Sequence, residues 1–117
     1  VNASAQFAAL EALKGPQDCV SHMNNTFKKR AEIMYTQLNE IEGFTCQKPK
    51  GAFYCFPNIT GTNKSATEIQ NILLDQIGVA TVAGTSFGKF GEGYIRLSCA
   101  NSEEAIEEAI LRIKNIF

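Results

Sequence analysis

The sequence predicts an α+β fold, in which helices pack on one face of a sheet of short strands. Apolar residues recur at helical spacing in four stretches and at strand-like spacing in four shorter ones, in the order α-α-β-β-α-β-β-α. A chain of 117 residues is long enough for a single core. One of its predicted helices is unusually long for a chain of this size. The composition, 44% hydrophobic and 20% charged, is typical of globular proteins.

The first third of the chain is predicted to form two helices. The first covers residues 3–14 and ends at Gly15, and the second begins near Pro16 and ends at Gly43. The second helix is amphipathic and about 25 residues, or about 37 Å, long. The apolar positions are Phe7, Leu10 and Leu13 in the first helix and Val20, Met23, Phe27, Ala31, Met34, Leu38 and Ile41 in the second. Few domains of this size need so long a helix, so we expect it to connect two domains.

A hairpin and a third helix are predicted next. The strand-like segments 44–48 and 52–56 are separated by Pro49-Lys50-Gly51, a sequence typical of a tight turn. After a polar loop, the capping box Ser65–Glu68 predicts the start of a helix that ends at Gly78.

The predicted sheet is completed by two more strands, at 79–83 and 93–100. A last helix follows them and packs on the sheet. We expect Asn101 to cap this helix, whose apolar positions are Ile106, Ala109, Ile110, Ile113 and Phe117. The economical architecture is a sheet of three or four short strands with the helices on one face.

Residue alternation in the last strand indicates which side chains face away from the core. One face carries Ile95, Leu97 and Cys99, and the other carries Tyr94, Arg96 and Ser98. A planar guanidinium on a stiff strand, next to a glycine-rich segment, suits bidentate binding of a carboxylate or phosphate. The alternative from this pattern alone is an ordinary exposed arginine on the solvent side of a sheet.

Several other kinds of site are excluded by the sequence. The net charge of −1 gives no electrostatic signature of nucleic-acid binding. A helix that spans a bilayer needs about 20 apolar residues, and no apolar run of this sequence approaches that length. The four cysteines are widely spaced and there is a single His, so we expect no metal site. The glycine-rich residues 84–93 are superficially similar to a phosphate-binding loop. However, Gly84 and Gly88 are one residue too close and Phe90 occupies the Ser/Thr position, so we expect a mobile loop instead.

Three runs of residues resemble the C-terminal motifs of class I aminotransferases, the fold-type I pyridoxal phosphate enzymes, with aspartate aminotransferase as the nearest branch. These runs are Gly51-Ala-Phe-Tyr-Cys-Phe-Pro-Asn, Gly78-Val-Ala-Thr-Val-Ala-Gly-Thr-Ser-Phe-Gly and Gly91-Glu-Gly-Tyr-Ile-Arg-Leu-Ser-Cys-Ala. They lie in the family's order and, with the two ends of the chain, cover essentially all of it. One departure is Ala83, where the family usually has Pro.

The resemblance implies a role for two residues and a division of the chain. Arg96 corresponds to the arginine that binds the substrate's α-carboxylate, and Phe87 to a loop phenylalanine near the mouth of the site. Residues 1–15 would belong to, or pack on, a large domain that lies outside this chain. Residues 16–42 would form the connecting helix, and residues 43–117 the α+β core of the small domain.

The resemblance also implies what this chain lacks. The lysine that binds pyridoxal phosphate, and the other cofactor-binding residues, lie upstream in the family, so we expect no catalytic and no cofactor-binding residue here. The full-length protein would be a homodimer that exchanges amino groups between α-amino acids and 2-oxo acids, and this chain alone would be inactive. We expect a reducing, cytoplasmic setting, because three of the four cysteines lie in apolar or strand-like runs, where free thiols act as small hydrophobic side chains. The alternative is a free-standing, non-catalytic α+β module that binds amino acids or a protein partner.

Overall fold

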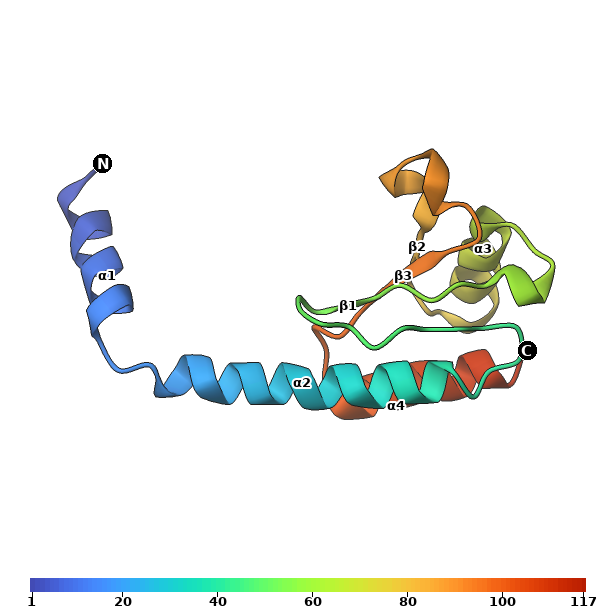
Figure 1. The fold of residues 1–117 in the computed structure, drawn as a ribbon, viewed down its shortest axis with the longest axis horizontal. Coiled ribbons are helices and arrows are strands. Elements are labelled where there is room, and N and C mark those ends of the chain that lie inside the picture. The colour runs from blue at the N-terminus through green and yellow to red at the C-terminus, as the bar shows by residue number, and fades with distance from the viewer.

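The computed structural model describes all residues from 1 to 117, which form an α+β body with a long N-terminal extension (Figure 1). The chain measures 54 × 28 × 24 Å, and its radius of gyration is 17.4 Å. A compact domain of this length would have a radius of about 13 Å, so the extension dominates the shape. The helices and strands are α1 (Ala3–Lys14), α2 (Asp18–Leu38), β1 (Tyr54–Cys55), α3 (Ala66–Ile77), β2 (Val82–Ala83), β3 (Ile95–Ser98) and α4 (Glu103–Lys114).

The sheet has three short strands in the order β1-β3-β2, and both pairs are antiparallel. β3 is therefore central. Tyr54 lies opposite Ser98 on one side of it, and Val82 lies opposite Arg96 on the other. This arrangement confirms the predicted α+β class.

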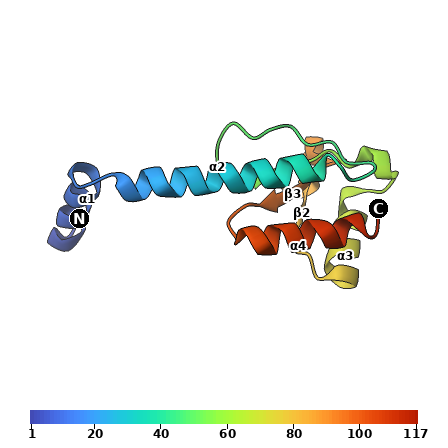
Figure 2. The ribbon, with the colours of Figure 1, turned by 90° about the horizontal axis from the view of Figure 1, so that it is seen from below.

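The core lies between the sheet and the helices. The buried side chains of β3 share one cluster with residues of α2, α3 and α4, among them Leu38, Ile69 and Ile110. α2 and α4 run side by side in the same direction (Figure 2). Lys29 of α2 pairs with Glu103 of α4, and Lys114 of α4 pairs with Glu40, two residues beyond the end of α2, each at 2.6 Å. No residue before Met34 is buried, so α1 and the first half of α2 contribute nothing to this core.

The structure confirms the predicted helices but not the predicted hairpin of residues 44–48 and 52–56. α2 ends at Leu38 rather than at Gly43, and residues 44–48 are not a strand; only Thr45 forms an isolated bridge, with Asn58. The Asn39 side chain bonds to the backbone N–H and C=O of the next residue, Cys46, at 2.9 and 2.8 Å, on the edge opposite to the Thr45–Asn58 bridge. β1 pairs with β3 and not with the segment before it.

Three smaller differences concern a helix cap, the lengths of the strands and the glycine-rich segment. Ser102, not Asn101, caps α4, since its hydroxyl accepts a hydrogen bond from the N–H of Ala105 at 3.2 Å. All three strands are shorter than predicted. Within the segment expected to be a mobile loop, residues 84–87 and 89–91 form two 3₁₀ turns. None of the helices is both long and apolar enough to span a lipid bilayer.

Candidate functional site

Strand β3 places Arg96 on the face of the sheet that is turned away from the helices. Its neighbours Ile95 and Leu97 are buried, whereas Arg96 itself is half-buried, as the alternation predicts. Because β3 is paired on both sides, the backbone that carries the guanidinium is held by two strands.

Two aromatic rings enclose the Arg96 guanidinium. Its Cζ atom lies 4.3 Å from the ring centre of Tyr54, on β1, and 4.5 Å from that of Phe87, in the glycine-rich segment. Both distances are within the range of a cation–π interaction. None of the chain's ion pairs or side-chain hydrogen bonds involves the guanidinium, so its N–H donors remain available to an anion.

A second layer of rings supports this arrangement. Phe56 stacks on Tyr94, with ring centres 5.3 Å apart and planes 6° apart, and meets Phe87 edge to face at 6.1 Å. Next to these rings is an open groove of about 840 Å³ whose lining includes Tyr54, Phe56 and Tyr94. Arg96 therefore lies on an aromatic surface formed by residues on or next to β1, just before β3 and in the glycine-rich segment.

The structure brings together both residues that the sequence singled out, Arg96 and Phe87. Sequence reasoning missed Tyr54, Phe56 and Tyr94. The available signal was alternation: Tyr54 and Phe56 flank the buried Cys55, and Tyr94 is two residues from Arg96 on the same face. That β1 lies next to β3, which places the rings around the guanidinium, could not be deduced from spacing.

The glycine-rich segment is folded tightly at its base and open at its tip. The N–H of Gly84 donates to the carbonyl of Tyr94 at 2.8 Å, and Gly84 lies against the backbone of Gly91. Gly88, at the tip, has a φ of 121°, a conformation that favours glycine. Phe87 is 53% exposed even though its ring contacts Arg96 and Phe56, so one side of it remains open to a ligand.

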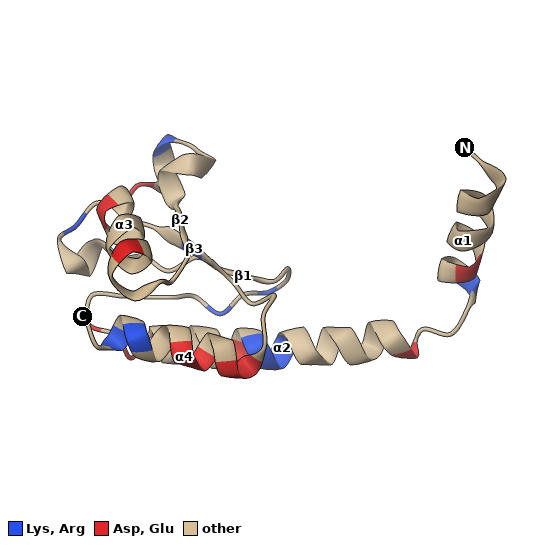
Figure 3. Cartoon of the chain, turned by 180° about the vertical axis from the view of Figure 1, so that it is seen from behind, with Lys and Arg blue, Asp and Glu red and all other residues tan.

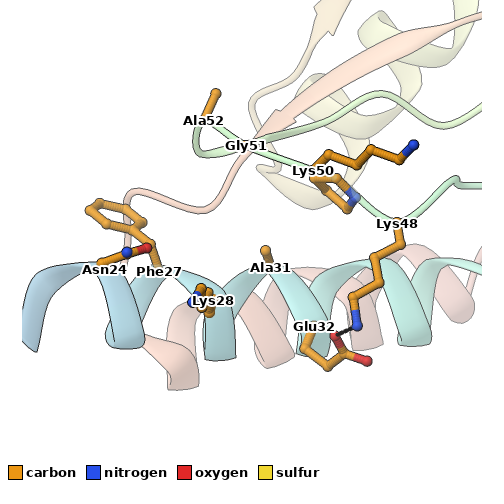
Figure 4. Close-up of a pocket in the computed structure, with 10 residues that line it drawn as sticks. Asn24, Phe27, Lys28, Ala31, Glu32, Lys48, Lys50, Gly51 and Ala52 are labelled. Atoms are coloured by element: carbon orange, nitrogen blue, oxygen red, sulfur yellow. Dashed lines mark ion pairs between the residues drawn. The ribbon is translucent and has the colours of Figure 1, made fainter. Parts of the chain in front are cut away.

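A separate hollow of about 460 Å³ lies between α2 and the turn at residues 48–52 (Figure 4). Figure 4 shows the ion pair between Lys48 and Glu32 beside it. Glu32 raises the pKa of Lys48, and Glu103 likewise raises the pKa of Lys29. A lysine that forms a covalent bond with a carbonyl group needs the opposite shift, so these amines are not poised for that chemistry.

The cysteines form part of the core rather than of a reactive site. Cys46, Cys55 and Cys99 are buried and unpaired, and the Cys99 Sγ lies 3.6 Å from the Met34 Sδ. Hydrogen bonds with the Cys46 and Cys99 thiols, together with burial, raise the pKa of Cys55. These residues act as small hydrophobic side chains, as the sequence indicates. No group of His, Cys, Asp and Glu side chains in the chain could hold a metal ion.

Comparison with known proteins gives a consistent result. The sequence profile of the family described as "Aminotransferase class I and II" matches residues 1–113. The putative aminotransferase YugH of Bacillus subtilis is 46% identical over 112 residues, which cover 96% of this chain and 29% of that protein. The aspartate aminotransferase of Pyrococcus horikoshii is 40% identical over 111 residues, which cover 93% of this chain and 28% of that protein.

Solved structures agree with this similarity. An alanine aminotransferase from Pyrococcus furiosus superposes with a TM-score of 0.92 at 38% identity, over 98% of this chain and 30% of that one. An aromatic aminotransferase from Pyrococcus horikoshii gives a TM-score of 0.90 at 39% identity, over 95% of this chain and 30% of that one. The chain thus spans about three-tenths of the length of the curated relatives it matches.

Proposed function

Because the chain belongs to the class I and II aminotransferases, we propose that it is the C-terminal small domain of an enzyme that transfers an amino group from an α-amino acid to a 2-oxo acid. The observation that carries this proposal is the Arg96 guanidinium, which has no anionic partner within the chain. All substrates and products of such a reaction share one group that this cation can bind, the α-carboxylate.

The surroundings of Arg96 favour a planar anion. A guanidinium presents parallel N–H donors that match the two oxygens of a carboxylate. The Tyr54 and Phe87 rings lie 4.3 and 4.5 Å from its Cζ atom, and no carboxylate of the chain pairs with its N–H groups. We propose that Phe87 lies beside the bound substrate and reduces the access of water to this ion pair, which strengthens the attraction.

Pyridoxal phosphate, the cofactor that the family implies, does not fit the residues of this chain. Seven of its eight lysines are exposed, and the eighth, Lys114, is held in an ion pair with Glu40. Only Lys48 and Lys50 line the groove beside the aromatic rings, and Lys48 is paired with Glu32. We propose that the cofactor binds to the part of the enzyme outside this chain, which then also supplies the catalytic residues.

The exposed N-terminal region supports the proposed division of the chain. Residues 1–15 would pack on the large domain, residues 16–42 would connect the domains, and residues 43–117 would form the small domain. Phe7 and Leu13 are 72% and 83% exposed on α1. Figure 3 shows in addition that α2 carries no Lys, Arg, Asp or Glu between Asp18 and Lys28. The exposed apolar side chains of α1, followed by a stretch of α2 without charges, are what a surface that packs on another domain would present.

The proposal also covers the substrate, the oligomeric state and the cellular compartment. We propose an aspartate aminotransferase-like enzyme that acts as a homodimer in the cytoplasm. The similarity to an aspartate aminotransferase supports the substrate. The unpaired Cys46, Cys55 and Cys99 suit a reducing compartment. Kinetics of the full-length protein with a panel of amino donors test the substrate, and a preference for a donor without a second carboxylate would contradict it.

Replacement of Arg96 in the full-length enzyme tests the role of the guanidinium. Arg96→Lys keeps the charge but loses the two-pronged geometry, and Arg96→Ala loses both. Loss of a desolvated, charge-assisted pair typically costs about 2–5 kcal/mol. We therefore expect kcat/KM for the amino donor to fall about a hundredfold or more in either variant, as measured by steady-state kinetics.

The matched control is Arg112→Lys, because Arg112 lies on α4 and forms an exposed ion pair with Glu108. It should change kcat/KM by less than about twofold. Cofactor absorbance and thermal unfolding should stay close to wild type in the Arg96 variants, since the side chain faces away from the core. A wild-type kcat/KM in Arg96→Ala, or loss of the fold instead of substrate affinity, would contradict the proposal.

A further inference from the structure

Glu92, near the end of the glycine-rich segment, contacts helix α3, which is distant in the sequence. Its Oε1 accepts a hydrogen bond of 2.9 Å from the N–H of Ala66, the first residue of α3. The capping box of α3 uses Ser65 and Glu68, and leaves this N–H unpaired within the helix. A carboxylate is also favoured at the positive end of a helix dipole. Glu92 therefore fixes the end of the segment to α3.

The start of the same segment is attached to the same helix. The Oε1 of Gln70 accepts a hydrogen bond of 2.7 Å from the N–H of Ala83, the residue before Gly84. Ala66 and Gln70 are four residues apart and thus lie on one face of α3. That face therefore holds both ends of residues 84–92.

Between these two attachments the backbone of the segment bonds mainly to itself. Gly88 donates to Thr85 and Gly91 donates to Gly88, while Gly84 is joined to Tyr94 at the base. Phe90, near the tip, is 87% exposed. The position of the Phe87 ring over Arg96 hence depends on how firmly the ends are held.

We infer that Glu92 and Gln70 are positioning residues that hold residues 84–92 on α3 and so keep Phe87 on the Arg96 guanidinium. This inference rests on the proposed function, in which Arg96 binds the α-carboxylate. Release of the Glu92 contact lets the segment move, uncovers one face of the guanidinium and weakens substrate binding. The chemical step, which depends on residues outside this chain, is affected little.

Three substitutions in the full-length enzyme test the inference. Glu92→Ala removes the acceptor, and we expect KM for the amino donor to rise about five- to tenfold while kcat stays within about twofold. Glu92→Gln keeps an oxygen that can accept the Ala66 N–H, so its KM should stay within about threefold of wild type. Asp75→Ala is the control, because Asp75 is an exposed carboxylate on the same helix without a hydrogen bond of its own.

A double-substitution cycle tests whether Glu92 acts through Phe87. In a Phe87→Ala background, Glu92→Ala should add little to KM, since the ring that it positions is absent. A full additional rise in KM in that background, or an unchanged KM in Glu92→Ala alone, would overturn the inference.

Hydrogen exchange separates this inference from the proposed function. Amides of residues 84–92 should exchange faster in Glu92→Ala than in wild type or Asp75→Ala, whether or not the protein is a transaminase. Absence of transamination in the wild-type protein would refute the proposed function, while faster exchange would still support the attachment to α3. Equal exchange in all three proteins would overturn the attachment itself.

Discussion

Gly84 and Gly91 determine how closely the base of the glycine-rich segment can fold. A Cβ atom added to Gly91 would overlap the carbonyl oxygen of Gly84, and one added to Gly84 would overlap that of Gly91. We expect Gly91→Ala to lower the free energy of unfolding by about 1–3 kcal/mol, as measured by urea denaturation, because the backbone has to shift. Gly51→Ala is the control, since nothing lies within 4 Å of its Cβ position. Equal stability of the two variants would show that the segment adjusts without strain.

At single positions, the sequence predicts which face of the sheet a side chain lies on better than it predicts which residues that side chain contacts. Alternation along β3 correctly places Arg96 opposite the buried Ile95 and Leu97. It does not reveal that Tyr54 and Phe87 lie on the guanidinium, because these residues are 42 and 9 positions away and reach it only through strand pairing and the fold of the glycine-rich segment. The resemblance to a known family, not the pattern, singled out Phe87.

Helix α3 shows how a local motif responds to pH. The Ser65 backbone N–H and hydroxyl both donate to the Glu68 carboxylate and hold its pKa below the ordinary range. Because folding lowers this pKa, the stabilisation is complete above the pKa of an unfolded glutamate, about 4.3, and is lost as the pH falls through the lower folded value. Glu68→Gln should therefore be less stable than wild type at pH 7, with a difference that shrinks below about pH 4.

Unfolding by urea at several pH values measures this difference. Glu107→Gln is the control, because Glu107 is an exposed glutamate on α4 that accepts no side-chain hydrogen bond. A difference between wild type and Glu68→Gln that stays constant from pH 7 to pH 3 would contradict the role of the ionised carboxylate.

Elements with strong local signals were predicted well, and those that depend on distant partners were not. The bounds of α1 and the capping box of α3 follow from residues within a few positions of each other. The hairpin prediction failed because β1 pairs with β3, whose partner residues lie more than 40 positions further along the chain, and the segments before and after the turn share only the bridge Thr45–Asn58. Asn101 and Ser102 are both good helix caps, so the choice between them depends on the path of the chain from β3.

The shape of the whole molecule sets the N-terminal region apart from the rest. The buried residues begin at Met34 and end at Ile113, and they form one core. α1 lies far from this core, beyond the free half of α2 (Figure 1). The sequence indicates this arrangement through the length of α2, which exceeds what one small domain can cover. It does not indicate what covers the apolar residues of α1, which in the proposed function is the large domain.

The exposed apolar residues of α1 lead to a prediction for the 117-residue chain on its own. Phe7, Leu10 and Leu13 recur on one side of the helix and are 72%, 48% and 83% exposed. Without a partner surface they should associate with each other in water, since burial of apolar area gains about 25 cal/mol per Å². We expect sedimentation velocity to show association that increases with protein concentration. Replacement of all three residues by Ser should shift the chain to a monomer without changing the core.

Leu111→Ser is the matched control, because Leu111 is an equally accessible leucine, 54% exposed, on α4 of the folded body. It should leave the association unchanged, which separates a specific contribution of α1 from a general effect of surface hydrophobicity. The same triple replacement in the full-length protein should lower its stability, since there the three residues would lose the large-domain surface they cover. A chain that is monomeric at every concentration, together with a full-length triple variant as stable as wild type, would mean that α1 has no apolar partner in either form.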